Sequence, residues 1–314
     1  MNSLSPQLRR TKRRKMPARS VYDLVGNTPL LDLSKYSPHP RVRIFAKAEW
    51  HNPGGSVKDR PASRIISTAV RSGQLTKEKF LLDASSGNTG LAYAMFAAAR
   101  GFRVRLAVPE NVSRYQKNLF RAFGADVVYT SAQDGSDGAI RAAQAIFAEA
   151  PEKYFYADQY GNQENWKAHY HTTAQEIWRQ TRGKLTHFVA GLGTSGTFVG
   201  VGRWLRMINQ AIRLISAQPD SPFHGLEGWK HLPSALVPAI YDERLADENL
   251  WIPTEAAQEL VRDLARREGL LVGLSAGGAL HAARQVAAEI DHGVIVTIFA
   301  DGGQRYLEEK FWEE

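Results

Sequence analysis

The chain has 314 residues, of which 43% are hydrophobic, 10% aromatic and 23% charged, so it can build the cores of two ordinary domains or one large one. It has no cysteine, which excludes disulfides and thiolate metal sites. The sequence has no apolar run of about 18 residues and no apolar leader segment, so we expect a cytoplasmic protein rather than a membrane or secreted one.

The formal net charge of +8 comes almost entirely from the N-terminal segment. Seven basic residues and no acidic one lie before Ser20, so the rest of the chain is close to neutral. We expect residues 1–20 to form a disordered, solvated basic tail. Nucleic-acid binding is therefore an alternative function, and it would depend on this tail alone.

From Val42 onward, short apolar segments alternate with Ala-rich segments of helical periodicity. Strands that are apolar along almost their whole length are typical of parallel sheets covered on both faces. Their alternation with helices predicts the α/β class, with doubly wound parallel sheets. The predicted strands cover residues 42–49, 79–85, 103–109, 125–130, 186–193, 212–218 and 294–301, and helices are predicted over 89–101 and 137–153.

One long segment breaks this alternation. Residues 219–251 contain several prolines and have neither helical nor strand periodicity. A loop of this length inside a compact domain is usually functional or disordered, and we expect one of these two roles.

Two glycine-rich loops lie where a predicted strand runs into a helix. "ASSGNTG" (84–90) follows the strand at 79–85, and "GLGTSGT" (191–197) follows the strand at 186–193. At such a junction the free backbone N–H groups and the positive end of the helix dipole form an anion site, to which Ser and Thr hydroxyls add donors. For either loop alone, the alternative is an ordinary turn with a Ser or Thr cap.

The second loop also matches the dinucleotide pattern G-x-G-x-x-G at residues 191–196. That fingerprint needs an acidic residue at the end of the next strand to hold a ribose hydroxyl. The next predicted strand ends at Gln218, and the nearest acid is Asp220, beyond Pro219. An NAD-binding oxidoreductase is therefore kept only as an alternative.

Four motifs occur in a fixed order: "NPGGSVKDRPA" (52–62), "SGNTG" (86–90), "GTSGT" (193–197) and "GLSAGGAL" (273–280). Together they resemble the pyridoxal-phosphate enzymes of fold type II, the tryptophan synthase β type, and within it the cysteine synthases. The similarity runs from Leu24 to Leu307. "PENVSRYQ" and "DQYGN" are most similar to the cysteine synthase B branch, which includes O-phosphoserine sulfhydrylases.

The resemblance implies that Lys58 forms the Schiff base with pyridoxal 5′-phosphate and then takes the substrate α-proton as general base. Such a lysine needs a neutral amine, which burial and the helix expected from about Pro61 would favour. The residues implied to bind the cofactor phosphate are Gly193, Thr194, Ser195, Gly196 and Thr197.

By the same resemblance, Asn88 would hydrogen-bond the ring 3′-oxygen and Ser275 would face the pyridine nitrogen. A serine cannot hold a full positive charge on the ring as a carboxylate would, and this favours loss of a β-leaving group over transamination. The residues implied to bind the substrate α-carboxylate are Ser85, Ser86, Gly87, Thr89 and Gln159.

The implied fold has two α/β domains with the cofactor in the cleft between them. The smaller, substrate-binding domain would span 52–160, and the larger, cofactor-phosphate-binding domain 21–51 and 161–314. The implied reaction replaces the β-substituent of O-acetylserine or O-phosphoserine with sulfur from sulfide or a protein thiocarboxylate, giving L-cysteine, in a homodimer. Alternatives within the class are cystathionine β-synthase, a diaminopropionate-forming synthase and a serine or threonine dehydratase.

The choice of leaving group depends on residues 219–251. A site that selects phosphate needs fixed cations as well as backbone donors. In the phosphoserine-using branch an arginine a few residues before a Val-Pro pair contacts the phosphate, and Lys230 takes that place before Val237-Pro238. A lysine would select phosphate more loosely than arginine. The alternative is an exposed loop lysine.

Two positions depart from the family pattern. Ser85 stands where threonine is more usual, and the closing motif, usually Ser-Gly-x-Arg-Tyr-Leu, reads here Asp301-Gly-Gly-Gln-Arg-Tyr-Leu. The nine histidines show no metal-ligand spacing. His169 and His171 lie at a predicted helix start, so we expect them to cap the helix or face solvent rather than bind a metal.

Overall fold

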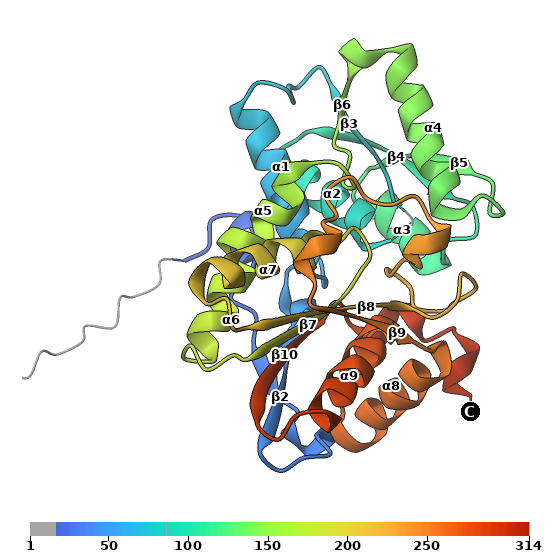
Figure 1. Cartoon of the computed structure of the whole chain (residues 1–314). Coiled ribbons are helices and arrows are strands. Elements are labelled where there is room, and N and C mark those ends of the chain that lie inside the picture. Colours follow the sequence, from blue (N-terminus) through green and yellow to red (C-terminus); the bar gives the residue numbers. More distant parts are fainter. Residues whose placement is uncertain (1–16, 86, 314) are drawn as a thin grey trace, which may run out of the picture.

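The computed structural model describes residues 17–85 and 87–313, so most of the predicted basic tail and Ser86 lie outside the described part. The described chain alternates strands with helices (Figure 1). The strands are β1 (Leu30–Asp32), β2 (Val42–Ala48), β3 (Phe80–Ala84), β4 (Arg103–Pro109), β5 (Asp126–Thr130), β6 (Tyr154–Tyr156), β7 (His187–Gly191), β8 (Arg213–Pro219), β9 (Glu248–Ile252) and β10 (Gly293–Phe299). The helices are α1 (Asp59–Arg71), α2 (Asn88–Ala98), α3 (Arg114–Ala122), α4 (Gly135–Glu149), α5 (Gln163–His171), α6 (Thr173–Gln180), α7 (Gly196–Ile208), α8 (Thr254–Glu268) and α9 (Leu274–Ala288).

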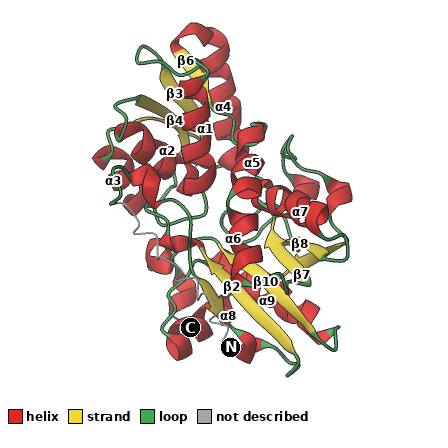
Figure 2. Ribbon diagram, turned by 90° about the vertical axis from the view of Figure 1, so that its left-hand side faces the viewer, coloured by secondary structure: helices red, strands yellow, loops and turns green. Residues whose placement is uncertain are grey.

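The strands form two separate sheets, as the two groups of strands in Figure 2 show. The smaller sheet has the order β5-β4-β3-β6 and is parallel throughout. The larger has the order β1-β2-β10-β7-β8-β9, in which only the β1–β2 pair is antiparallel. Strands β2 and β10, from opposite ends of the chain, pair over seven residues. The predicted α/β class with two parallel sheets is confirmed.

Both faces of each sheet are covered by helices. In the larger sheet, Val189 and Ile215 pack in one core with α8 and α9, while their neighbours Phe188 and Leu214 pack on the opposite face with α6 and α7. The smaller sheet has α1, α2 and α3 on one face and α4 on the other. Successive strand residues point to opposite faces, so a strand covered on both sides must be apolar throughout. Because these strands are covered on both faces, they could be predicted from the apolar runs in the sequence.

All seven predicted strands are present, whereas β1, β6 and β9 were not predicted. Strand β9 lies inside the segment 219–251, so the prediction of an unstructured loop there was wrong at its C-terminal end. Between β8 and β9 the segment contains only two short 3-10 helices, Leu232–Ser234 and Glu243–Leu245. The strands of the smaller sheet fall within the predicted segment 52–160, but the domain boundaries themselves stay a prediction.

A buried ionic cluster joins the start of α1 to the larger sheet. The Arg60 guanidinium donates to Glu49 at 2.6 Å and to Glu176 at 2.8 Å, and Lys47 donates to Glu176 at 2.7 Å. Arg60 is only 2% exposed and Lys47 is fully buried. Because a buried charge without a partner is costly, the cluster fixes α1, and the loop before it, against β2 and α6.

Among residues 17–85 and 87–313, no helix has the length and apolar character needed to cross a bilayer.

Candidate active site

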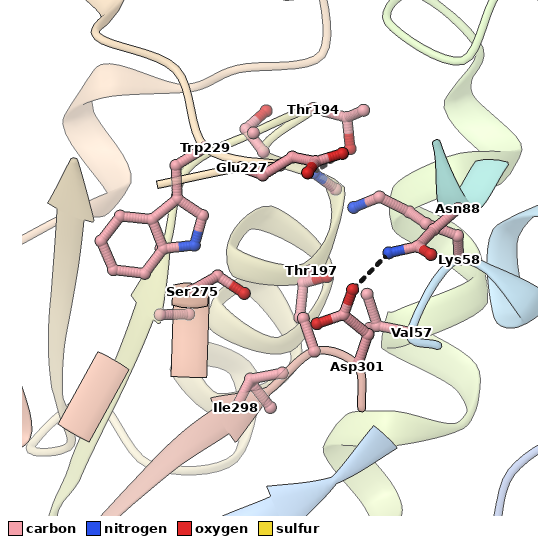
Figure 3. Close-up of a pocket in the computed structure, with 17 residues that line it drawn as sticks. Val57, Lys58, Asn88, Thr194, Thr197, Glu227, Trp229, Ser275, Ile298 and Asp301 are labelled. Carbon is pink, nitrogen blue, oxygen red and sulfur yellow. Dashed lines mark hydrogen bonds between the residues drawn. The ribbon is translucent and has the colours of Figure 1, made fainter. Parts of the chain in front are cut away.

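A pocket of about 580 Å³ opens where strands of the two sheets end (Figure 3). In parallel α/β sheets ligands bind at the carboxyl ends of the strands, which is where the loops after β7 and β10 lie. The pocket brings together residues from all four sequence motifs. It is lined by Val57, Lys58, Asn88, Ala190, Gly191, Gly193, Thr194, Ser195, Gly196, Thr197, Glu227, Gly228, Trp229, Ser275, Ile298, Ala300 and Asp301.

Lys58 directly precedes α1, which begins at Asp59 rather than near Pro61. The glycine turn before it has Gly55 at φ +78°, a conformation that favours glycine, so the turn can reverse the chain tightly. The Lys58 side chain extends into the pocket (Figure 3). Desolvation lowers the pKa of its amine, and the nearby Asp301 charge opposes this shift. The amine is therefore easier to deprotonate than an ordinary lysine, as a carbonyl-reactive amine requires.

The loop Gly193–Thr197 lies across the pocket and leads into α7. Ser195 adopts a left-handed conformation, with φ 64°, that is uncommon for a residue other than glycine. Its hydroxyl is buried and has no hydrogen-bond partner among the described residues. Buried polar atoms are normally paired, so a strained backbone that holds an unpaired hydroxyl beside a helix N-terminus indicates an anion site.

Two glycines of the G-x-G-x-x-G match are required by close packing. A β-carbon at Gly191 would lie 1.9 Å from the Trp229 ring, and one at Gly193 would lie 2.0 Å from the carbonyl oxygen of Gly228. The segment 225–230 thus packs directly on the glycine loop. These glycines make room for a neighbouring protein segment, which accounts for the pattern without a dinucleotide.

His169 lies behind this loop, and its predicted position at a helix start, as a cap or a surface residue, is wrong. It lies near the C-terminal end of α5 instead of a helix start, and it is 1% exposed, so it neither caps nor faces solvent. Its ring nitrogens contact the Thr173 hydroxyl at 2.9 Å and the Thr197 hydroxyl at 3.3 Å. Burial and then the Arg60 charge lower the pKa of His169 to about 3, so the ring is neutral and supports Thr197. His171, in contrast, is exposed as expected.

Asn88 and Asp301 meet in the pocket. Asn88 begins α2, its amide donates to the Asp301 carboxylate at 2.7 Å, and its own carbonyl oxygen is buried without a partner in the described chain. The Tyr306 hydroxyl donates to the same carboxylate oxygen at 2.6 Å. Burial raises the pKa of Asp301, and these two hydrogen bonds oppose the shift. Asp301, which directly precedes the closing motif, therefore lies inside the site.

Ser275 is in the first turn of α9 and is 5% exposed. It lines the pocket next to the Trp229 ring (Figure 3). The predicted cofactor-binding residues thus all border one pocket, and their roles stay predictions.

A second pocket of about 630 Å³ is continuous with the first, since both are bordered by Lys58, Asn88 and Thr194. It contains the described residues that were predicted to bind substrate, namely Ser85, Gly87, Thr89, Gln159 and Lys230. The Gln159 amide donates to the Ala84 carbonyl at 2.7 Å and accepts from the Thr89 hydroxyl at 2.7 Å, which fixes both side chains beside the loop. Ser86 belongs to the same prediction but lies outside the described residues.

Lys230 lies in this second pocket and is 8% exposed, so the alternative of an exposed loop lysine is wrong. Its amine pairs with Asp137, near the start of α4, at 3.0 Å, and lies 5.1 Å from the centre of the Tyr160 ring. Asp137 also accepts from the Leu236 backbone N–H. The pair therefore links the 219–251 segment to the smaller sheet unit across the cleft.

Glu227 and Asp301 also line the pocket, and neither was predicted as a site residue. Glu227 falls in no motif, and Asp301 directly precedes the closing motif without a role implied by the resemblance. Each lies beside a glycine in a loop that follows a strand. In the part of the chain that the structure describes, no three His, Asp or Glu side chains are arranged to hold a metal.

The donor set fits the cofactor expected from the sequence. The unpaired Ser195 hydroxyl and the N-terminus of α7 suit a phosphate, and the easily deprotonated amine of Lys58 suits an aldehyde. The unpaired carbonyl oxygen of Asn88 and the Ser275 hydroxyl supply further polar groups at the pocket wall.

Comparisons with known proteins identify the family of this chain. The family model described as "Pyridoxal-phosphate dependent enzyme" matches residues 21–301. The chain is 48% identical to cysteine synthase of Aquifex aeolicus (strain VF5) over 92% of this chain and 90% of that protein. It is 40% identical to cysteine synthase B of Salmonella typhimurium over 90% of this chain and 92% of that protein.

A solved structure has the same fold. The crystal structure of cysteine synthase from Entamoeba histolytica superposes with a TM-score of 0.90 at 32% identity, covering 100% of this chain and 94% of the other. The similarity of sequence and structure extends over both sheets and the pocket between them. The chain therefore belongs to the pyridoxal-phosphate-dependent enzymes, and within them to the cysteine synthases.

Proposed function

We propose that this enzyme makes L-cysteine by replacing the β-substituent of an O-activated serine with sulfur, and that O-phosphoserine is one of its substrates. The observation that carries the proposal is the convergence of Lys58, Asn88, Ser275 and the loop 193–197 on one pocket that continues into a second. When bound, pyridoxal phosphate withdraws electrons from the substrate α-carbon, which makes the α-proton acidic.

The residues around the first pocket hold this cofactor. Lys58 would hold its aldehyde carbon covalently, and the backbone and hydroxyl donors of residues 193–197 would bind its phosphate. The contact between His169 and Thr197 keeps one of these hydroxyls oriented. Asn88 bonds the ring oxygen, and Ser275 bonds the ring nitrogen without a full charge, which favours elimination at the β-carbon.

Residues of the second pocket bind and orient the amino acid. Ser85, Gly87 and Thr89, around the N-terminus of α2, would bind the α-carboxylate together with Gln159. Ser86 is proposed for the same role from the resemblance alone. The Lys58 amine borders both pockets, where it would take the substrate α-proton and later return it.

Lys230 supplies a cation for a phosphate leaving group. Its burial in the second pocket supports this role, because a desolvated charge interacts more strongly with a substrate anion. Asp137 already pairs with Lys230, so an incoming phosphate has to compete with that carboxylate. We therefore propose that O-phosphoserine is accepted and that O-acetylserine is also used.

We further propose a homodimer located in the cytoplasm that takes its sulfur from sulfide or from a protein thiocarboxylate. These proposals rest on the resemblance to the family.

Steady-state cysteine formation from O-phosphoserine and O-acetylserine tests the substrate proposal. Lys230→Ala should lower kcat/KM for O-phosphoserine by roughly tenfold or more, the size of one lost charge-assisted contact, and leave O-acetylserine much less affected. The matched control is Lys167→Ala, which removes a partly exposed lysine paired with Glu164 away from the pocket. Equal losses on both substrates would mean that Lys230 supports the loop. A wild-type enzyme that forms no cysteine from either substrate would contradict the proposed function.

A further inference from the structure

Glu227 borders both pockets at the point where they join. Figure 3 shows its carboxyl group directed toward Thr194 and the end of the Lys58 side chain. A β-carbon placed on Gly87, in the loop predicted to bind the substrate carboxylate, would lie 3.5 Å from a Glu227 carboxylate oxygen. Lys230 follows three residues later and also lines the second pocket. Glu227 thus lies beside the space available to a bound amino acid.

The surroundings of Glu227 favour its protonated form. Desolvation of its carboxyl group by the cleft walls, and then the negative charges of Asp301 and Glu309, raise the pKa of Glu227 to about 7, against a hydrogen bond from Gln116 and the charge of Arg305. The residue as a whole is still reached by solvent. The Tyr306 hydroxyl and the amines of Lys58 and Lys230 also face this part of the cleft.

Substrate binding should strengthen this preference. Glu227 is accessible to solvent through the open cleft. A substrate in the cleft displaces that water and adds at least one negative charge, and both changes favour the neutral carboxyl group. Glu227 is then a proton donor inside the complex.

We propose, building on the function proposed above, that Glu227 is the general acid that protonates the departing oxygen of the substrate's β-substituent. The α-proton passes to Lys58, and the electron pair of the Cα–H bond becomes the second bond between Cα and Cβ. The Cβ–O bond breaks, its electron pair leaves with the oxygen, and the Glu227 proton forms the new O–H bond. A phosphoserine dianion therefore departs as hydrogen phosphate, and Glu227 takes a proton back from water.

The need for this proton depends on the leaving group. A phosphate trianion is strongly basic and departs poorly without protonation. Acetate is a carboxylate of about the same basicity as the glutamate side chain, whose usual pKa is about 4.3, and it departs unaided. Lys58 keeps the α-proton, because that proton must return to the α-carbon when sulfur is added. The proton for the leaving group therefore has to come from a second donor, Glu227.

The test compares Glu227→Gln with Glu149→Gln, a matched variant at an exposed position at the end of α4, outside both pockets. Each holoenzyme is mixed with O-phosphoserine or O-acetylserine in single-turnover rapid-quench experiments that measure released phosphate or acetate. Glu227→Gln should slow phosphate release by about a hundredfold or more and acetate release by less than about threefold, since lost general acid catalysis costs about 10²–10⁴-fold. Glu149→Gln should change neither rate by more than about threefold.

Two further measurements separate this role from a structural one. Below about pH 6 phosphoserine itself carries the proton, so the defect of Glu227→Gln should shrink there. In the cofactor-free chain labelled with carbon-13 at glutamate carboxyl groups, the Glu227 resonance is the one that is missing from the spectrum of Glu227→Gln. Its chemical shift should titrate with a pKa of about 7.

Several results would overturn the proposal: equal losses on both substrates, no loss on either, a defect that persists unchanged below pH 6, or a Glu227 resonance that titrates as an ordinary glutamate. A wild-type enzyme that releases acetate but no phosphate would also overturn it, because no leaving group would need the acid. Release of neither product by the wild type would contradict the proposed function itself, before any variant is compared.

Discussion

The Asn88 amide donates a hydrogen bond of 2.7 Å to the carboxylate of Asp301, across 213 residues of sequence. The first residue of α2 in the smaller unit is thereby tied to the loop that follows β10 in the larger one. The negative charge of Asp301 also raises the pKa of the Lys58 amine, against the lowering effect of burial. This one carboxylate joins the two halves of the site and tunes its lysine.

Asp301→Asn should lower the pKa of Lys58, because the substitution removes the negative charge and keeps an oxygen that can accept from Asn88. The cofactor-free variant should therefore bind pyridoxal phosphate covalently down to a lower pH than wild type. The measurement is the rate of covalent binding as a function of pH, followed by absorbance. Asp291→Asn, at a carboxylate that is 84% exposed, is the control. An unchanged or higher midpoint in Asp301→Asn would show that Asp301 does not act on Lys58.

Arg60→Met should destabilise the fold by about 3–5 kcal/mol, because it leaves the buried carboxylates of Glu49 and Glu176 with too few partners. The free energy of unfolding is obtained from urea titration. Arg64 lies on the same helix as Arg60 and forms a partly exposed ion pair with Glu164 of α5. Arg64→Met should lower the free energy of unfolding by only about 0–1 kcal/mol. Similar losses in the two variants would mean that the buried cluster does not anchor α1.

More of the fold than of the site could be predicted from the sequence. Parallel strands covered on both faces are apolar throughout, so β2, β3, β4, β7, β8 and β10 were visible in the sequence. The edge strand β5 was also predicted, from its run Val127-Val128-Tyr129. The strands that were missed, β1, β6 and β9, are short and lie at sheet edges, where fewer positions are buried and the apolar signal is weaker.

Within the site, motifs located the residues whose backbone geometry is special, such as Ser195 and the glycine turn before Lys58. They assigned no site role to Glu227, Asp301 or His169, because the first two side chains reach the pocket, and the third reaches Thr197, only through tertiary packing. Their burial and partners depend on elements distant in the sequence. His169 was mistaken for a surface residue for this reason, as its partner Thr197 follows 28 residues later.

His169→Gln should reduce the acid sensitivity of the fold. The native pKa of His169 is lowered to about 3 from an ordinary value of 6.5, so below about pH 6.5 the unfolded chain binds a proton that the folded chain does not. The free energy of unfolding therefore falls as pH falls through this range, by up to about 1.4 kcal/mol per pH unit from this residue. The slope between about pH 6 and 4.5, measured by urea titration, should be smaller in the variant. His171→Gln, at the exposed neighbouring histidine, should keep the wild-type slope, and the same slope in His169→Gln would show that His169 is not held neutral.

The function proposed above requires that the cofactor of this cysteine-forming enzyme be bound to Lys58. Borohydride reduction of the holoenzyme, followed by peptide mass mapping, identifies the lysine that carries it, with Lys58→Ala treated in parallel. We expect the reduced pyridoxyl group on the peptide that contains Lys58, none in Lys58→Ala, and no cysteine formation by that variant. A label on another lysine of the wild type, or near wild-type cysteine formation by Lys58→Ala, would contradict it.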